Sequence, residues 1–401
     1  MLTARKDTPL QFDPSLPGLA ADPYPVYHRL RAEDPVHWSP IIGMWVLTRY
    51  ADAVAVLRDD SRFAKGGRQV VERKLASGPL LEVQSRWMLF LDPPDHERLR
   101  GLVTKAFTPR RVEEMRPRIQ SIVDELLDAV EDGEMELMSE LAYPLPVIVI
   151  SEMLGVPDKE RSELMGWAGD IARTLDPVLA PEIVDRGSRA VEASVDCFRR
   201  LARARRSNLN GDLLSALITA EQDGNRLTED ELAATCLLLF AAGHETTASL
   251  IGSGTLALLQ HPDQLDLLQN DPSLVRSAVE ECLRYQPSAQ MTGRLAREDV
   301  EIGGKAIRKG DRVMVCLGAA NRDPEVFPDP DRLDITRPNL RQIAFGGGIH
   351  FCLGAALARI EAQVALDTLV RRMPSLRLSA EKPRWRESFS LHGLEYLRVG
   401  F

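Results

Sequence analysis

The stretch Phe345-Gly346-Gly347-Gly348-Ile349-His350-Phe351-Cys352-Leu353-Gly354 is the most informative part of this sequence. Its three consecutive glycines permit a tight turn with positive φ and leave room for a large flat group against the backbone. A helix is predicted directly after Cys352, because apolar residues recur at offsets of four, three and four: Leu353, Leu357, Ile360 and Val364. Cys352 is therefore expected at a helix N-terminus, where the dipole and free N–H groups stabilise a thiolate.

Three interpretations of Cys352 follow from these residues alone. A buried structural cysteine is the ordinary one, but the glycine run makes it less attractive. A nucleophile with His350 as its base is disfavoured, because residues two apart rarely point at each other. A single thiolate with no other soft ligand nearby in sequence suits haem iron.

Composition limits the class of protein. The chain has 401 residues, 44% of them apolar, and a net charge of −9, so nucleic-acid binding is not suggested. Its five cysteines are odd in number and widely spaced, which argues against a disulfide framework or a cysteine-rich zinc site. The N-terminus has no apolar segment typical of a signal peptide or membrane anchor, so we expect a soluble, cytoplasmic protein.

Periodicity predicts a mainly α protein with small marginal β-sheets. Apolar residues of the run 118–131 fall on one helical stripe, whereas strand-like runs occur only near Trp45, in 300–317 and in 389–399. The proline-rich stretch Asn321–Asn339 contains buried-type apolar residues, so we expect an ordered coil and not a linker. We therefore expect one domain over residues 1–401.

The longest predicted helix begins after Thr228, which forms a capping box with Glu231, and ends before His261-Pro262. It is apolar nearly all round until Ala242-Gly243-His244-Glu245-Thr246-Thr247 interrupts it, which is too early for a membrane span. An acid beside a hydroxyl and a glycine indicates either a polar pocket for water or a diatomic ligand, or a bend filled by satisfied side chains.

Three motifs together resemble the cytochrome P450 superfamily, the haem-thiolate monooxygenases. Residues 345–354 fit Phe-Gly-x-Gly-x-His-x-Cys-x-Gly, residues 242–247 fit Ala-Gly-x-Glu-Thr-Thr, and Glu281 to Arg284 fit Glu-x-x-Arg. The resemblance covers the chain from about Asp22 to its end and is closest to bacterial members. It implies the P450 fold, with haem b (iron protoporphyrin IX) between the long central helix and the cysteine loop.

The resemblance assigns roles to particular residues. Cys352 is the implied iron ligand, and Glu281 with Arg284 is an implied buried structural pair completed by Arg332. The remaining residues implied to contact the haem or its propionates are His96, Arg100, Arg294, His350, Phe345, Gly346 and Gly354.

The implied reaction is hydroxylation or epoxidation of a lipophilic small molecule such as a fatty acid, steroid, terpenoid or polyketide, with O2 as co-substrate. Thr246 and Glu245 would relay protons to the site of O2 activation. Because the chain carries no flavin or iron–sulfur segment, electrons from NAD(P)H would arrive through a separate ferredoxin or flavodoxin and its reductase. The basic stretch Arg98–Arg118 is the implied docking surface. We expect a monomer, with no nucleic-acid partner.

A substrate pocket is expected across the haem, covered by the segments 65–90 and 165–179. Its expected lining is apolar for the most part and consists of Leu238, Leu239, Ala242, Ala289, Gln290, Met291, Thr292, Phe389 and Leu391. Two alternatives to hydroxylation remain: a P450-fold enzyme that performs oxidative coupling or peroxide-driven oxidation, and a non-enzymatic haem sensor or electron carrier.

Overall fold

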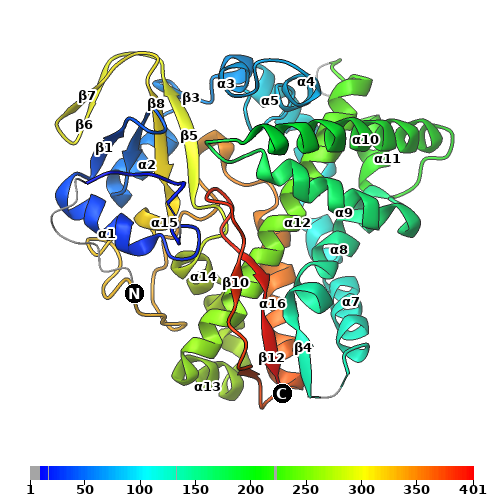
Figure 1. Ribbon diagram of the computed structural model, residues 1–401. Helices are drawn as coiled ribbons and strands as arrows, with labels where there is room; N and C mark the ends of the chain where they lie inside the picture. The colour runs from blue at the N-terminus through cyan, green and yellow to red at the C-terminus, as the bar shows by residue number, and fades with distance from the viewer. Residues whose placement is uncertain (1–9, 17, 132, 221–223) are drawn as a thin grey trace.

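The computed structural model describes residues 10–16, 18–131, 133–220 and 224–401. Within them the chain is mainly helical with small sheets, as the sequence predicted (Figure 1). The helices of the first half are α1 (Tyr24–Glu33), α2 (Tyr50–Arg58), α3 (Gly67–Leu75), α4 (Pro79–Gln84), α5 (Asp95–Ala106), α6 (Pro109–Glu114), α7 (Arg116–Asp128), the π-helix η1 (Met138–Ala142), α8 (Pro144–Leu154), α9 (Asp158–Arg173) and α10 (Pro181–Arg206). Those of the second half are α11 (Leu213–Thr219), α12 (Glu229–Gln260), α13 (Pro262–Asn270), the 3₁₀ turn η2 (Pro272–Leu274), α14 (Val275–Tyr285), α15 (Leu317–Ala320), the 3₁₀ turn η3 (Gly348–His350) and α16 (Ala355–Arg372).

The strands are short and form small sheets beside the helices. They are β1 (Val36–Ser39), β2 (Met44–Leu47), β3 (Phe63–Ala64), β4 (Glu134–Glu136), β5 (Met291–Ala296), β6 (Val300–Ile302), β7 (Lys305–Ile307), β8 (Arg312–Cys316), β9 (Arg377–Leu378), β10 (Arg384–Trp385), β11 (Leu394–Tyr396) and β12 (Arg398–Gly400). The largest sheet has the order β1-β2-β8-β5-β3, in which only β2 and β8 pair in parallel. This sheet joins β1, β2 and β3 of the N-terminal region to β5 and β8, which come more than 200 residues later in the chain.

Helix α12 is the central element, and it begins as the sequence predicts. The Thr228 hydroxyl accepts from the Glu231 N–H at 3.2 Å, and the Glu231 carboxylate accepts from the Thr228 N–H at 2.9 Å. α12 crosses the molecule and packs against α8, α9, α10, α14 and α16 (Figure 1). Among the described residues it is the one helix apolar and long enough to span a membrane by composition, but 78% of its apolar window is buried, as in a core helix.

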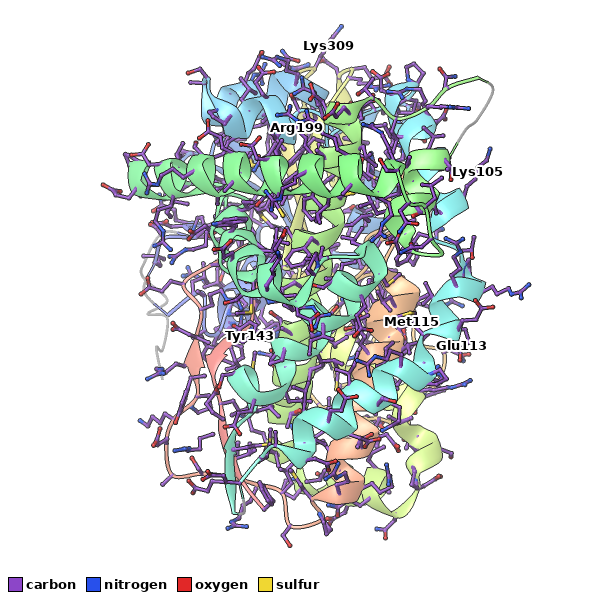
Figure 2. The ribbon with its side chains drawn as sticks, turned by 90° about the vertical axis from the view of Figure 1, so that its right-hand side faces the viewer. Lys105, Glu113, Met115, Tyr143, Arg199 and Lys309 are labelled. Carbon is purple, nitrogen blue, oxygen red and sulfur yellow. The ribbon has the colours of Figure 1, made fainter. Side chains whose placement is uncertain are left out.

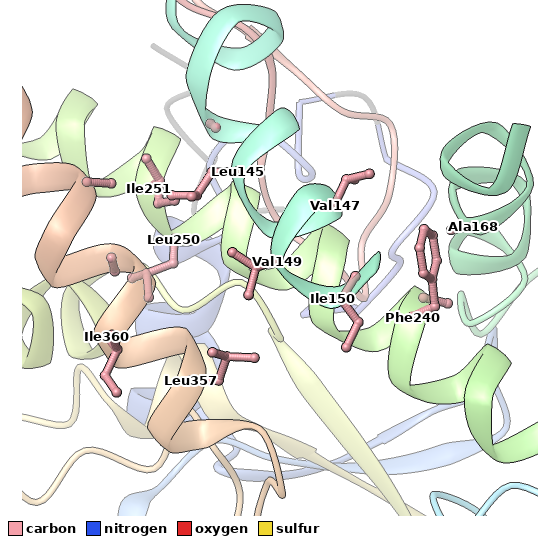
Figure 3. Close-up of a cluster of buried hydrophobic side chains, with 14 of the residues drawn as sticks. Leu145, Val147, Val149, Ile150, Ala168, Phe240, Leu250, Ile251, Leu357 and Ile360 are labelled. Carbon is pink, nitrogen blue, oxygen red and sulfur yellow. The ribbon is translucent and has the colours of Figure 1, made fainter. Parts of the chain in front are cut away.

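The apolar face of α16 is buried against this central helix and its neighbours. Figure 3 shows Leu357 and Ile360 of α16 in one cluster with Leu250 of α12 and with Val149 and Ile150 of α8. Each of these side chains is at most 6% exposed. Burial of a leucine or isoleucine of this kind stabilises a fold by about 1.5–3 kcal/mol, so α12 and α16 are fixed relative to each other.

The proline-rich coil of residues 321–339 is ordered, as expected, because a buried ion pair organises it. Arg284 donates to both carboxylate oxygens of Glu281, at 2.8 and 2.7 Å, and the two side chains are fully buried. The same guanidinium donates to coil carbonyl oxygens at 2.8–3.1 Å, those of Asn321, Pro330 and Arg332.

The expected role of the Arg332 side chain in this pair is wrong. Arg332 contributes its backbone carbonyl, whereas the second guanidinium that reaches Glu281 belongs to Arg337, at 3.3 Å from Nε to Oε1. Arg337 is 9% exposed, while the Arg332 residue lies at the exposed edge of the coil. The coil turns between these two arginines, so the later one points inward.

Candidate functional site

The cysteine loop, residues 345–354, is a closed turn held by its own backbone. The Cys352 N–H donates to the Phe345 carbonyl at 3.0 Å, and the Gly346 N–H donates to Ile343 at 2.9 Å. Gly346 and Gly348 have φ of +72° and +65°, as a glycine run permits. A Cβ on Gly348 would lie 2.2 Å from the Leu57 carbonyl oxygen, so this glycine is required by contact with α2. The sequence argument that the glycines leave space for a flat group does not apply to Gly348.

Cys352 differs from the other four cysteines because its side chain is accessible, while theirs are buried. Protein nevertheless surrounds the sulfur closely. Burial raises the pKa of the Cys352 thiol, and this outweighs the opposing effects of the Gly354 N–H and the Arg100 guanidinium. The expected stabilisation of a thiolate by the turn is therefore present, but burial outweighs it.

One face of α12 is accessible although the helix is otherwise buried. Leu239, Ala242, Gly243 and Thr246 reach solvent, and their spacing of three, one and three residues places them on a single helical face. The helix continues unbroken through this polar stretch, and the Thr246 hydroxyl donates to the Ala242 carbonyl at 2.8 Å. Where the sequence predicted a polar pocket or a bend, the structure thus has a continuous helix with an open face and a hydroxyl on it.

Glu245 lies on a buried side of α12, next to the open face. Its carboxylate accepts a hydrogen bond from Arg386, which precedes β11 and also donates to the Tyr143 hydroxyl. Burial opposes the charge of Arg386, but Glu245 and Tyr143 raise its pKa overall. The Glu245 side chain is 7% exposed and that of Arg386 is 15% exposed, so the carboxylate that we expected to connect to solvent is paired inside the protein.

Five basic side chains, here called the basic cluster, gather at the edge of the cysteine loop: Lys65, His96, Arg100, Arg294 and His350. The ring centroids of His96 and His350 lie 4.3 Å apart, and within the described part of the chain both nitrogens of His96 and Nε2 of His350 are buried without a hydrogen-bond partner. Burial, together with the neighbouring Lys65, His96 and Arg294, lowers the pKa of His350 to about 2. Burial lowers the pKa of Arg294 to about 10. A cluster of this composition favours an anionic ligand.

The alternation of strand β5 explains which of its residues reach the basic cluster. Arg294 and Thr292 point to one face, where the Arg294 guanidinium donates to the Thr292 hydroxyl at 3.3 Å. Met291 points to the other face and packs in the N-terminal core. Sequence reasoning assigned Thr292 to the substrate pocket, although the two-residue period counted back from Arg294 placed it on the same face as that arginine. It also missed Lys65, which no local pattern marks.

Two further residues expected in the pocket belong to the N-terminal core. Gln290 is 1% exposed and accepts from the Tyr27 hydroxyl at 3.2 Å, while Phe389 packs edge-on against Phe12 with ring centroids 5.3 Å apart. These two side chains are buried and make their contacts in that core. Ala289 and Leu391 form an isolated β-bridge, and Leu238 is 8% exposed beside the open face of α12.

The residues present fit haem on three observations of this structure. Cys352 is exposed, both ring nitrogens of His96 and Nε2 of His350 are buried without a partner among the described residues, and α12 has an open apolar face with one hydroxyl. A haem supplies an iron for the thiolate, two carboxylates for the basic cluster and an apolar ring. A groove of about 640 Å³ also lies where α5 meets the cysteine loop, lined by His96, Arg100, Lys105 and Gly348 among others.

Comparison with known proteins identifies the family. Residues 38–385 match the family model described as Cytochrome P450. The chain is 42% identical over 383 residues to the biotin biosynthesis cytochrome P450 of Bacillus subtilis (95% of this chain, 96% of that protein), and 43% identical over 392 residues to 6-deoxyerythronolide B hydroxylase of Saccharopolyspora erythraea (94% and 96%). The crystal structure of P450BioI, solved with an acyl carrier protein bearing hexadec-9Z-enoic acid, superposes with a TM-score of 0.91 at 41% identity, covering 96% of this chain and 98% of that one. The chain therefore belongs to the cytochrome P450 family, whose members are haem enzymes that use O2 and reducing electrons, and it is a monooxygenase of that family.

Proposed function

We propose that this monooxygenase hydroxylates or epoxidises a lipophilic small molecule in the cytoplasm, as a monomer whose residues 1–401 form one domain. Its electrons come from NAD(P)H through a separate ferredoxin or flavodoxin and its reductase. The single observation that carries the proposal is the exposed Cys352 beside the basic cluster, in which the described residues leave both ring nitrogens of His96 and Nε2 of His350 without a hydrogen-bond partner. The family match and the coverage of whole relatives support it.

Cys352 is the proposed thiolate ligand of haem b. Its loop supplies the backbone of Phe345, Gly346 and Gly354 around the sulfur, and the Gly354 N–H lowers the pKa of the thiol. His96, Arg100, Arg294 and His350 are the proposed contacts of the haem propionates. When bound, the haem supplies the oxidative chemistry, and the protein positions it and controls protons.

Thr246 and Glu245 are the proposed proton carriers for O2 activation. Thr246 presents its hydroxyl on the open face of α12, while Arg386 holds the Glu245 carboxylate on the buried side. Because Glu245 is ion-paired with Arg386, its carboxylate must first take up a proton before it can pass one toward Thr246. We expect Thr246→Val to lower product formation by about 100-fold while substrate binding, followed by the spin-state shift, stays unchanged. Equal turnover in the variant and the parent enzyme would remove Thr246 from the relay.

We propose that the electron donor docks on only part of the basic stretch Arg98–Arg118. Four of its arginines pair with acids, Arg98 with Glu231 and the others with residues of α6, α7 and α8: Arg110, Arg116 and Arg118. Figure 2 shows Lys105 and Glu113 along the same side of the molecule, so both signs of charge are present there. We place the donor at the groove between α5 and the cysteine loop, and we expect its reduction of the enzyme to slow as ionic strength rises.

Substrate class follows from the open face of α12 and from the relatives. Leu239 and Ala242 give that face an apolar character, which favours aliphatic ligands. The relatives named above include one crystallised with a fatty acid on an acyl carrier protein and one that hydroxylates 6-deoxyerythronolide B. We propose that the substrate is a fatty acyl chain or a polyketide, with steroids and terpenoids as further members of a screening panel. Spin-state shifts across this panel identify the binders.

The test of the haem proposal is the ferrous–CO spectrum of the purified protein. The parent protein and Cys197→Ala should both show the red-shifted band of a thiolate-ligated haem, whereas Cys352→Ala should lose it. Cys197 is a matched control because it is a cysteine of α10 engaged with Glu160. If Cys352→Ala keeps the band, the ligand is another residue and the proposal fails.

Labelled O2 distinguishes monooxygenation from the alternatives. One atom of ¹⁸O in the product supports hydroxylation or epoxidation. A product without the label, formed with O2 or with peroxide, would instead support oxidative coupling or a peroxide-driven reaction. Absence of any product with every electron donor and substrate of the panel would favour a haem sensor or electron carrier.

A further inference from the structure

Lys65 is a buried lysine whose ammonium group forms no ion pair with the acids of the described residues, the nearby Asp92 included. It directly follows β3, is 7% exposed, and donates from Nζ to the Thr292 hydroxyl at 2.8 Å. Burial, with the nearby Arg294, lowers the pKa of Lys65 well below its usual value.

Arg294 shares the same neutral acceptor. Its guanidinium donates to the Thr292 hydroxyl and, at 2.9 Å, to the carbonyl of Gly293, and the residue is 5% exposed. Two cationic side chains thus converge on one hydroxyl in a buried place. Such an arrangement costs desolvation and repulsion unless an anion joins it.

The nearest acid, Asp92, has its carboxylate committed to the backbone. Its two oxygens accept the N–H groups of Lys65 and Gly66, at 2.7 and 2.8 Å. The Arg297 guanidinium approaches the same carboxylate to within 3.8 Å from the surface. Asp92 therefore fixes the chain at residues 65–66 and leaves the side-chain ammonium directed toward Thr292 and Arg294.

We propose that Lys65, with Thr292 and Arg294, binds a carboxylate of the haem, in addition to the contacts already assigned to the propionates. This inference rests on the proposed function, because it takes haem as the group bound at Cys352. The carboxylate supplies the anion that the described protein groups lack, and the Thr292 hydroxyl aligns the two donors. Lys65 thereby contributes to how firmly the cofactor is held.

The first experiment measures haem loss from the holoenzyme to excess apomyoglobin. Lys65→Met should release haem about 10- to 100-fold faster than the parent enzyme, since a hydrogen bond to a charged group is lost in a buried site. Lys65→Arg keeps the charge and should stay within a few-fold of the parent enzyme, as should Lys309→Met. Lys309 is the matched control because it is an exposed lysine at the surface (Figure 2). Equal rates for Lys65→Met and Lys309→Met would overturn the inference.

A second experiment separates a carboxylate contact from a packing role. The parent enzyme and Lys65→Met are reconstituted with the dimethyl ester of haem, in which both carboxylates are masked. The two proteins should then lose the esterified haem at the same rate. A difference as large as that with native haem would show that Lys65 acts through the fold and would overturn the inference. If the parent enzyme itself carries no thiolate-ligated haem, the proposed function fails, which is a distinct outcome.

Discussion

Two buried clusters of charged side chains in this protein differ in whether the protein satisfies them. In the Glu281 cluster, the carboxylate accepts from Arg284, Arg337 and the Asp334 N–H, and the remaining Arg284 donors go to coil carbonyls. In the basic cluster, considering the described residues, the side chains of Lys65 and Arg294 donate only to neutral oxygens, and the His96 ring has no hydrogen-bond partner.

This difference separates scaffold from ligand site. A buried network that is complete within the protein stabilises one arrangement of the chain, and removing one partner leaves an uncompensated charge. A buried cluster of one sign that is left incomplete has an energetic reason to bind an external group of the opposite sign. The first cluster joins α14 to the coil of residues 321–339, and the second surrounds the edge of the cysteine loop.

The largest expected effect is on the completed cluster. Glu281→Ala should destabilise the fold by about 3–5 kcal/mol, because Arg284 would remain buried and charged without a carboxylate. Urea unfolding followed by circular dichroism measures this, with the exposed pair Arg110–Glu114 as a control, where Glu114→Ala should change little. A loss below about 1 kcal/mol would mean that the cluster does not hold the scaffold.

Glu361 is a buried acid outside both clusters, and it tests whether an incomplete buried group lowers stability. It lies on α16 at 2% exposure with Oε2 unpartnered, and burial raises its pKa to about 8. Between the unfolded pKa near 4.3 and the folded pKa, the folded state binds more protons than the unfolded one. Stability should therefore be greatest at low pH with respect to this group and fall as pH rises toward 8.

The matched variant is Glu361→Gln, which is neutral at every pH. Relative to it, the parent protein should lose up to about 1.4 kcal/mol of unfolding free energy for each pH unit between about 5 and 7. Urea unfolding at pH 5, 6, 7 and 8 gives the two slopes. Equal slopes of unfolding free energy against pH for the parent protein and Glu361→Gln would show that burial of the Glu361 carboxyl does not make stability depend on pH.

Substitution of Arg294 should affect the binding of haem and leave stability almost unchanged, in contrast to substitution of Glu281. Arg294→Met should leave the urea unfolding midpoint of the protein almost unchanged, since it removes a buried charge that the protein does not neutralise. Haem loss to apomyoglobin should accelerate about 10-fold or more. A variant that unfolds easily yet releases haem at the parent rate would reverse the distinction between the two clusters.

Local features of the fold were predictable from the sequence, because they depend on neighbours along the chain. The capping box at Thr228 and the helix after Cys352 are of this kind, as is the pairing of Glu281 with Arg284 three residues on. Partners from distant segments were not predictable. Lys65 and Thr292 are 227 residues apart, and Glu245 and Arg386 are 141 apart. No periodicity encodes such contacts, which arise only once the sheet and the C-terminal strands are in place.

Substitutions of Arg332 and Arg337 should have the smallest effects on stability. They also test directly where the structure differs from the sequence prediction. The two residues are five apart in the same coil, yet only the Arg337 guanidinium contacts Glu281, and it also donates to the carbonyls of Pro328 and Arg332. Arg337→Met should therefore destabilise the protein by about 1–2 kcal/mol, through the lost charge-assisted hydrogen bonds. Arg332→Met keeps the backbone carbonyl that Arg284 uses, so it should change stability by less than about 0.5 kcal/mol. If the two variants unfold at reversed urea midpoints, Arg332 supplies the inward side chain after all, and the coil turns differently between residues 332 and 337.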